Sequence, residues 1–200
     1  MSNPASRAPR SAPPADADAR GRILEAALAA FSENGFDGAR TRDIARRAGV
    51  TLGLLQYHFG SKAALWRAAV DLAFSELRAG ADSLQTEGSP RERLGHAIRA
   101  LVHFVGRHPE FVRMMHDEGK RRGPRARWLA DRHVKPLDGQ LGPLIEAAQA
   151  AGLLVPDVAP AHLVYALVGA ADGIFHQSEE CRRVAGLDPT EESAIEAHAR

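Results

Sequence analysis

Residues 41–62 read TRDIARRAGVTLGLLQYHFGSK, and the order of residue types in this stretch decides the fold. Its first half has an inner apolar face at helical spacing, formed by Ile44, Ala45 and Ala48. Gly49 permits the positive φ that a sharp turn requires, and Val50 with either Leu54 or Leu55 is placed to fill the gap that follows. The pattern predicts two short helices, over roughly 41–48 and 51–58, joined as a helix-turn-helix.

Basic side chains are concentrated in and around this stretch. The formal net charge of the chain is only +1, yet residues 38–62 carry Arg40, Arg42, Arg46, Arg47 and Lys62 against the single acid Asp43. Such a local excess in a near-neutral chain indicates a localised anionic partner. For Arg46 and Arg47, plain helix-surface charge is the favoured interpretation.

The second helix is suited to lie in the major groove of DNA. Its outward positions are Thr51, Leu52, Gly53, Gln56 and Tyr57. Glutamine suits a bidentate contact with adenine, and small or apolar side chains can touch a thymine methyl group. Arg42, His58 and Lys62 are placed to hold phosphates, which supplies affinity without reading sequence. Two alternatives stay open: His58 as a partly buried structural histidine and Tyr57 as a core residue.

Three consecutive segments resemble one family. They are ILEAALAAFSENGFDGA (23–39), TRDIARRAGVT (41–51) and GLLQYHFGSKAAL (53–65), and in order, spacing and residue type they resemble the DNA-binding domain of TetR-family transcriptional regulators. The resemblance implies that Thr41 and Arg42 begin the first helix of the motif and that Thr51 starts the recognition helix. Gln56 stands where the family usually has tyrosine, and Arg40 replaces a polar cap. The expected DNA-binding residues are Thr41, Arg42, Thr51, Leu52, Gly53, Gln56, Tyr57, His58 and Lys62.

The remaining chain has helical periodicity throughout and no convincing strand. We expect an all-α protein of about nine helices, with a helix-turn-helix domain over residues 16–66 and a larger helical domain over 67–200. Ser89-Pro90-Arg91-Glu92 forms a capping box with proline at the first helical position. His108-Pro109 starts another helix, a long one runs to Gly152 with kinks near Pro136 and Pro143, and the last helix begins at Asp188.

Residues 1–15, MSNPASRAPRSAPPA, are rich in Pro, Ala and Ser and are expected to be disordered. Two interpretations stay open for this arm: a solubilising leader, or a basic segment that follows a DNA groove.

The helices after residue 66 resemble the family's effector-binding and dimerisation domain in length and helical character. An apolar effector pocket with few polar groups is expected from Phe104, His108, Phe111, Met114, Met115, Trp128 and Tyr165. In the segment AHLVYALVGAADGIFHQ (161–177), small residues recur at three- and four-residue spacing: Ala166, Gly169, Ala170 and Gly173. Family dimers pair their last two long helices, so these residues are expected at a homodimer interface. Ordinary core packing is the alternative for both groups.

These observations favour a ligand-responsive repressor that binds a palindromic double-stranded DNA operator as a homodimer and is released by a small apolar or amphipathic effector. No catalytic residues, metal or cofactor are expected: the sequence has no His-Glu-x-x-His, Gly-x-Ser-x-Gly or phosphate-cradling loop. No apolar run approaches the ~20 residues of a membrane span, and a cytoplasmic, nucleoid-associated protein is expected. A metal-responsive regulator, a helical protein–protein adaptor and an enzyme are the rival classes.

One cysteine, Cys181, excludes a disulfide within the chain. A redox-sensing role for its thiol, favoured by the neighbouring Arg182 and Arg183, is a minor alternative.

Overall fold

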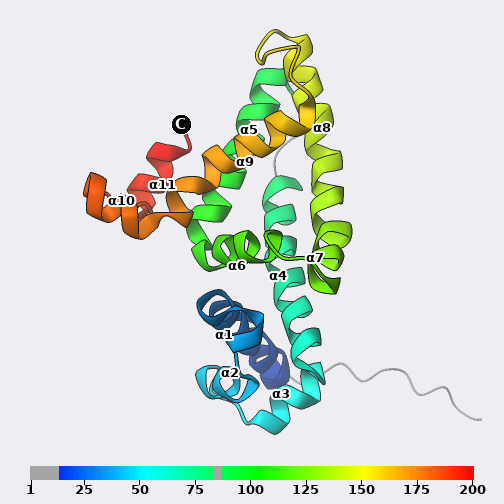
Figure 1. Ribbon diagram of the computed structural model, residues 1–200, viewed down its shortest axis with the longest axis vertical. Helices are drawn as coiled ribbons and strands as arrows, with labels where there is room; N and C mark the ends of the chain where they lie inside the picture. Colours follow the sequence, from blue (N-terminus) through cyan, green and yellow to red (C-terminus); the bar gives the residue numbers. More distant parts are fainter. Residues whose placement is uncertain (1–13, 83–86) are drawn as a thin grey trace, which may run out of the picture. The chain divides into compact units, whose positions relative to one another are not determined.

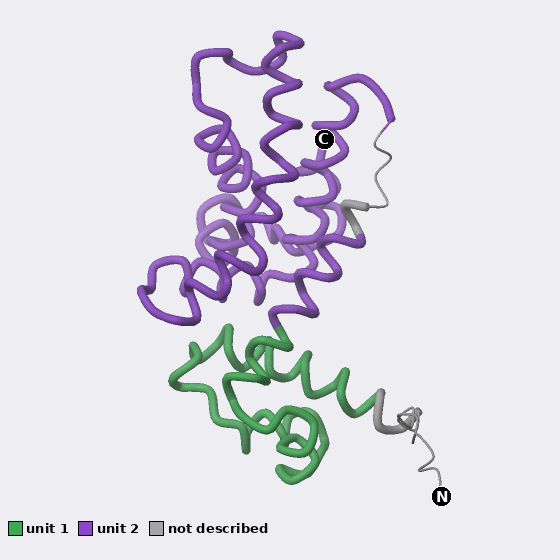
Figure 2. The backbone as a smooth tube through the Cα atoms, turned by 90° about the vertical axis from the view of Figure 1, so that its right-hand side faces the viewer, with its two compact units in different colours: residues 1–69 green, residues 70–200 purple. Residues whose placement is uncertain are grey.

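The computed structural model describes the backbone of residues 14–82 and 87–200, and the side chains of residues 18–79 and 87–200. Every regular element within these residues is a helix, so the all-α prediction is confirmed. The chain divides into two compact units, residues 1–69 and 70–200 (Figure 2). The dividing point lies inside helix α4 (Lys62–Asp82), as does the boundary expected after residue 66. Residues 1–13 of the expected N-terminal arm lie outside the described part.

The first unit comprises α1 (Pro14–Gly38), α2 (Thr41–Arg47), α3 (Leu52–Phe59) and the start of α4 (Figure 1). Helix α1 packs against both α2 and α3. The core side chains are nearly all apolar and include Ile23, Ala27, Phe31, Ile44, Leu55, Leu65 and Trp66. Helix α1 contributes Ile23, Ala27 and Phe31 to this core.

Glycines set the helix ends in the first unit. Gly35, with φ of 66°, interrupts the regular part of α1, and Gly49, also with φ of 66°, makes the turn after α2. L-residues rarely adopt this backbone conformation, whereas glycine does so without steric cost. Ser61 then caps α4, because its hydroxyl accepts a hydrogen bond from the Ala64 amide at 3.1 Å.

The second unit contains the remainder of α4 and seven further α-helices. Their bounds are α5 (Pro90–Arg107), α6 (Pro109–Gly119), α7 (Pro124–Leu129), α8 (Lys135–Ala150), α9 (Pro160–His176), α10 (Ser178–Ala185) and α11 (Glu192–His198). Helix α5 packs against α6, α8, α9 and α11, and α8 also packs along α9 (Figure 1). The predicted capping box is present, since Ser89 and Glu92 exchange side-chain-to-backbone hydrogen bonds at the start of α5. The start of α6 at Pro109 also agrees with the prediction.

The long helix expected before Gly152 is divided into three segments. Between α7 and α8 lies a π-helical turn, η1 (Ala130–Val134), and α8 contains Pro143 in its interior. Pro136 lacks an N–H donor, and its ring would clash with the carbonyl of residue 132 in a regular helix. The wider π turn directly before Pro136 accommodates this clash, so the main irregularity lies a few residues ahead of the proline itself.

The C-terminal segment differs from the sequence prediction. Helix α10 was not expected, and the last helix starts at Glu192 because Asp188 instead organises a turn. The Asp188 carboxylate accepts hydrogen bonds from the Thr190 amide and hydroxyl and from Arg182. These hydrogen bonds, that from Arg182 foremost, hold the pKa of the Asp188 carboxyl below its ordinary value.

Helix α11 approaches α5 closely at Gly106. Ile195 of α11 is 1% exposed, and a Cβ atom added at Gly106 would lie 2.8 Å from Ile195 Cγ1 and 3.1 Å from Phe175 Cε1. Only glycine fits at this crossing without displacing those two buried side chains. At the edges of the same contact, Arg107 pairs with Glu192 at 2.5 Å, and His198 Nε2 lies 3.1 Å from the Ala170 carbonyl oxygen.

Candidate DNA-binding and ligand-binding sites

The turn between α2 and α3 is built by backbone hydrogen bonds. The Ala48 amide donates to the Ile44 carbonyl at 2.9 Å and the Val50 amide donates to the Ala45 carbonyl at 3.0 Å. Arg22 of α1 secures the same turn, because its Nε donates to the Ala48 carbonyl at 3.2 Å. Of the two leucines proposed to fill the gap, Leu55 is the buried one, at 2% exposure.

Helix α3 presents its expected outward residues to solvent. Thr51, Gly53 and Gln56 are exposed, Tyr57 is 78% exposed, and Leu52 and His58 are half-buried. The hydroxyl of Thr51 also has a structural role, since it caps α3 by accepting from the Leu54 amide at 3.2 Å. Tyr57 is therefore not a core residue, and an aromatic side chain with this exposure is available to a partner.

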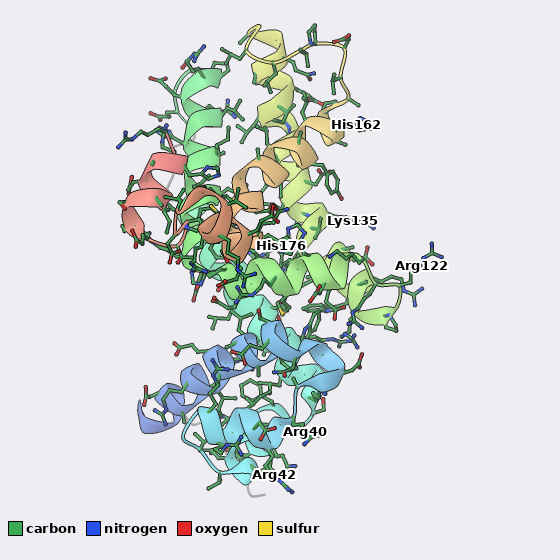
Figure 3. The ribbon with its side chains drawn as sticks, turned by 60° about the vertical axis from the view of Figure 1, so that its left-hand side comes forward. Arg40, Arg42, Arg122, Lys135, His162 and His176 are labelled. Carbon is green, nitrogen blue, oxygen red and sulfur yellow. The ribbon has the colours of Figure 1, made fainter. Side chains whose placement is uncertain are left out.

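The cations around α3 fall into two groups. Arg46 pairs with Asp43 at 2.8 Å and Arg47 pairs with Glu33 at 2.9 Å, as surface charges of the unit. Arg40 and Arg42 are exposed and form no ion pair with any other described residue; Figure 3 shows both at the α2 end of the unit. Arg40 belongs to the basic cluster noted in the sequence but is not among the residues expected to contact DNA. It does precede α2 without a side-chain cap hydrogen bond, which leaves its guanidinium available.

Lys62 and Thr41 are less available to a DNA partner than the exposed residues of α3. The Lys62 ammonium donates to the Asp37 carbonyl at 3.1 Å and lies 4.8 Å from the centre of the Phe36 ring. It therefore ties the start of α4 to the end of α1, and a phosphate contact would have to share its hydrogens with that tie. Thr41, the first residue of α2, is half-buried.

In the second unit, the structure brings several of the expected pocket residues together. Phe104, Phe111 and Met114 are buried; the Phe104 ring lies 5.3 Å from Phe111 and 4.8 Å from His108. Met115 is half-buried on the same helix as Met114, and Trp128 of α7 is also half-buried. Tyr165 does not belong to this cluster: it is 72% exposed. Its position on α9 places it on the face that carries the small residues. The aromatic character of Tyr165, on which the pocket prediction rests, does not show which way that face is turned.

Two buried carboxylates border this region, and the sequence analysis did not identify either pairing. Glu118 of α6 is 4% exposed and accepts a hydrogen bond from Arg125 Nε at 3.2 Å. Asp172 of α9 is 8% exposed, with Oδ2 lying 3.1 Å from His116 Nε2. The His116 ring also stacks on His176 at 4.1 Å. Each pair joins two helices, so no local sequence pattern could have revealed it.

The small residues of α9 lie on an open face of the single chain. Ala166, Gly169 and Ala170 are exposed, Gly173 is half-buried, and a Cβ atom at either glycine would meet nothing within 4 Å. Internal core packing is thus not their role within one chain. A face of this kind lets a second helix approach closely.

Three histidines of α5, α6 and the junction between them have separate surroundings. His103 lies 3.9 Å from Glu196, His108 lies 3.5 Å from Glu76, and His116 faces Asp172. Among the described residues, one group has compatible ligand atoms within 4.8 Å of one another: His103, Glu192 and Glu196. Its Glu192 is already paired with Arg107. Cys181 is a free, half-buried thiol.

None of the helices in the described ranges combines the length and apolar character needed to cross a membrane. The geometry of the first unit, with an exposed second helix and unpaired cations beside it, defines a helix-turn-helix DNA-binding protein that carries a separate helical unit.

Comparison with known proteins agrees with both units. Residues 23–69 match the model of the bacterial regulatory proteins of the tetR family, and residues 90–200 match that of a tetracyclin repressor-like C-terminal domain. The chain is 32% identical over 151 residues to the HTH-type transcriptional repressor NicS of Pseudomonas putida, covering 72% of this chain and 69% of NicS. This chain belongs to the TetR family of bacterial transcriptional regulators.

Solved structures show the same fold. SCO3833, a TetR-family member from Streptomyces coelicolor A3, is 25% identical, with a TM-score of 0.68 covering 89% of this chain and 87% of that one. The regulator FadR of Bacillus subtilis, solved in complex with stearoyl-CoA, is 15% identical, with a TM-score of 0.66 covering 90% of this chain and 97% of its own. The predicted class, a ligand-responsive DNA-binding transcriptional repressor, is confirmed at the level of the family, whose members typically bind palindromic operators as dimers. Its relatives are transcriptional regulators, which is a non-enzymatic role.

Proposed function

We propose that a homodimer of this chain represses transcription by inserting α3 of each protomer into the major groove of a palindromic operator. The observation that carries the proposal is the exposure of Gln56 and Tyr57 on α3 beside the unpaired cations Arg40 and Arg42. Gln56 is suited to adenine, while Thr51, Leu52 and Gly53 suit close approach and contact with a thymine methyl group. Arg40, Arg42, His58 and Lys62 supply phosphate contacts that position the helix.

The proposed dimer pairs the open face of α9 with that of a second protomer. Ala166, Gly169, Ala170 and Gly173 allow close helix approach, and the exposed Tyr165 lies along the same face. A two-fold dimer places its two α3 helices in successive major grooves, about 34 Å apart. This arrangement requires an operator with inverted half-sites and explains how a short recognition helix obtains specificity.

We propose that the effector is an amphipathic molecule whose apolar part enters among Phe104, Phe111, Met114, Met115 and Trp128. Aromatic and methionine side chains form adaptable apolar surroundings, and Glu118, His108 and His116 provide sparse polar groups. The fatty acyl ligand of the FadR structure makes a long-chain acyl-CoA a reasonable first compound to test. No further cofactor is proposed.

Release follows if effector binding changes the position of α4, which begins in the first unit and continues into the second. The effector can act only through different affinities for the DNA-binding and released states. A protein with this task is expected to act on the chromosome in the bacterial cytoplasm.

The decisive experiment is selection of fragmented genomic DNA by the purified protein, followed by sequencing of the retained fragments. An enriched palindrome is expected, and Tyr57→Ala or Arg42→Ala should reduce its retention at least ~10-fold, as loss of one or two good contacts does. Arg46→Ala is the matched control, because Arg46 already pairs with Asp43. A fall in affinity as salt rises from 50 to 200 mM is also expected, with a smaller slope for Arg42→Ala. Equal retention of all sequences would contradict an operator-binding function.

The metal-responsive alternative is separated by repeating the selection with a chelator present. Unchanged retention of the palindrome, together with an unchanged response to acyl-CoA, favours the organic effector.

A further inference from the structure

His133 is the most deeply buried histidine of the described chain, at 1% exposure, and it lies inside the π-helical turn η1. Its ring stacks on Phe74 of α4, with ring centres 4.2 Å apart and planes within 10° of each other. Burying a polar ring is costly unless polar groups face its nitrogens.

The two ring nitrogens face opposite charges of α4. Nε2 lies 3.0 Å from Asp71 Oδ1, and Nδ1 lies 3.3 Å from Arg78 Nη1. Arginine has only donors, so Nδ1 must accept and the single proton is assigned to Nε2, where it faces the Asp71 carboxylate. The neutral imidazole therefore accepts a hydrogen bond from the cation of α4, and its other nitrogen lies close to an anion of the same helix.

This connection defines the position of α4 in two directions. Asp71, Phe74 and Arg78 are spaced i, i+3 and i+7, so they share one face of the helix. Asp71 and Arg78 are about 10 Å apart along the axis, at about 1.5 Å per residue. Rotation of α4 would remove Phe74 from the imidazole, and a shift by one residue would break both polar contacts.

Burial of the ring favours its neutral form. Burial lowers the pKa of His133, and Arg78 and Arg132 act in the same direction against the opposing effect of Asp71. A second proton would also place an N–H on Nδ1 against the Arg78 guanidinium, which removes the acceptor that Arg78 uses.

His133 also contacts the proposed ligand-binding cluster. The Trp128 ring lies edge-on to His133 at 5.2 Å, and Phe111 lies edge-on to Phe74 at 5.1 Å. A ligand that displaces Trp128 or Phe111 therefore disturbs one or other ring of the His133–Phe74 stack.

We propose that His133 is the positioning residue through which the ligand-binding cluster sets the register of α4, and that its contacts with Asp71, Phe74 and Arg78 hold α4 in the DNA-binding position. This inference rests on the proposed function, because it assumes that α4 transmits the signal to the operator-binding unit. Beyond the proposed function, the inference names His133 as the residue that contacts α4 and predicts that DNA binding depends on pH.

The test compares operator affinities of wild type, His133→Phe, Arg78→Met and the double variant. Phenylalanine keeps the stack on Phe74 and removes both polar contacts, so each single variant is expected to weaken operator binding roughly 5- to 10-fold. Because both substitutions break one connection, the double variant should be no weaker than the weaker single variant. His96→Phe on α5 is the matched control. Additive losses, or wild-type affinity of His133→Phe, would overturn the proposal.

A pH profile separates a positioning role from a structural one. Between pH 7.5 and 5.5, the operator affinity of wild type should fall more steeply than that of His133→Phe. Only the wild-type protein has an imidazole at this position, and its lowered pKa means that it takes up a proton at a pH below the ordinary pKa of histidine. Parallel profiles would count against the proposal.

Hydrogen exchange measured without DNA tests the hold on α4 independently of operator binding. Amides of residues 70–78 should exchange faster in His133→Phe and Arg78→Met, with α8 unchanged. If wild type retains no palindrome but this exchange pattern is found, the function assigned to the protein is wrong while the hold on α4 stands. If exchange is unchanged in both variants, the hold itself is absent. Arg78→Met, at a partly exposed position, keeps the test valid should His133→Phe fold poorly.

Discussion

The described cores of the two units differ in polarity. The DNA-binding unit buries Ser32 as its one polar side chain, whereas the second unit buries Glu118, His133, Asp172 and Ser178. In the DNA-binding unit, surface ion pairs such as Arg47–Glu33 remain about half exposed. In the second unit, the Arg125–Glu118 pair is largely removed from water. The same kind of residue pair thus has different energetic roles in the two units.

This difference is informative about their tasks. The free energy gained by burying apolar side chains depends little on pH or exact geometry. Such a core suits the DNA-binding unit, which must keep one shape. Buried charges are stable only with well-placed partners, and each lost partner is costly. A unit that must change state on ligand binding can use such pairs, because displacing one partner produces a large response.

The largest effect expected from this contrast is at Arg125. Arg125→Met leaves the Glu118 carboxylate buried without its cation, and the free energy of unfolding should fall by about 3 kcal/mol, the lower end for a buried pair because Arg125 is partly exposed. The control is Arg47→Met in the first unit, whose exposed pair contributes about 1 kcal/mol or less. Urea denaturation followed by circular dichroism measures both. Equal losses in the two variants would remove the contrast between the units.

A smaller but still marked loss is expected at Gly106. Gly106→Ala places a methyl group against Ile195 and Phe175 and should destabilise the second unit by about 2 kcal/mol, within the usual range for overpacking. Gly139→Ala in α8 is the matched control, because a Cβ atom there meets nothing within 4 Å and alanine favours a helix. Thermal denaturation should show a lower Tm for the first variant and an equal or higher one for the second.

Two histidines that contact α4 should give opposite pH dependences. The carboxylates of Glu110 and Glu76 raise the pKa of His108, so its stabilisation is fully present below pH 6.5 and is lost as pH rises through the folded-state pKa. Burial lowers the pKa of His133, so stability falls as pH decreases below 6.5, where the unfolded chain takes up the proton first.

The measurement is the free energy of unfolding from pH 5 to 9 for wild type, His108→Gln and His133→Phe. The destabilisation caused by His108→Gln should shrink as pH rises above 6.5, and His133→Phe should flatten the decline at acid pH. Changes of the same sign in both variants would show that the two rings do not differ in this way.

The smallest effect on stability is expected on α3. Tyr57→Ala and Arg42→Ala should change the free energy of unfolding by no more than about 0.5 kcal/mol, since both side chains are exposed. The free energy of unfolding of each variant is measured by denaturation and compared with its loss of operator retention. The comparison tests whether these side chains contribute to DNA binding without contributing to the fold. A loss above about 1 kcal/mol would mean that the side chain is part of the fold.

Local signals explain why the first unit could be predicted in detail. Gly49, Thr51 and the apolar spacing around Ile44 each determine their structure within a few residues. The capping box at Ser89 is equally local, and the start of α5 agrees with it.

Features of the second unit that join distant residues could not be predicted. His133 meets Arg78 across 55 positions and His116 meets Asp172 across 56, and no periodicity contains such pairings. Tyr165 is expected in a pocket because it is aromatic, but residue type does not show whether a side chain of α9 faces its own chain or an open surface. Helix α10 is not predicted because its short sequence, SEECRRVA, contains few apolar residues.

Helix α4 has a consequence for protein engineering. The two matched family regions end at residue 69 and begin at residue 90, so Asp71, Phe74 and Arg78 fall between them. Consider a chimaera that joins this DNA-binding unit to the second unit of another protein. The family boundaries do not specify which of the two parent proteins should supply these three residues. Transferring residues 70–82 together with the second unit preserves the contacts between His133 and α4. A biosensor built in this way should keep its response to the ligand. One built with α4 from another protein should bind DNA but should not be released by the ligand.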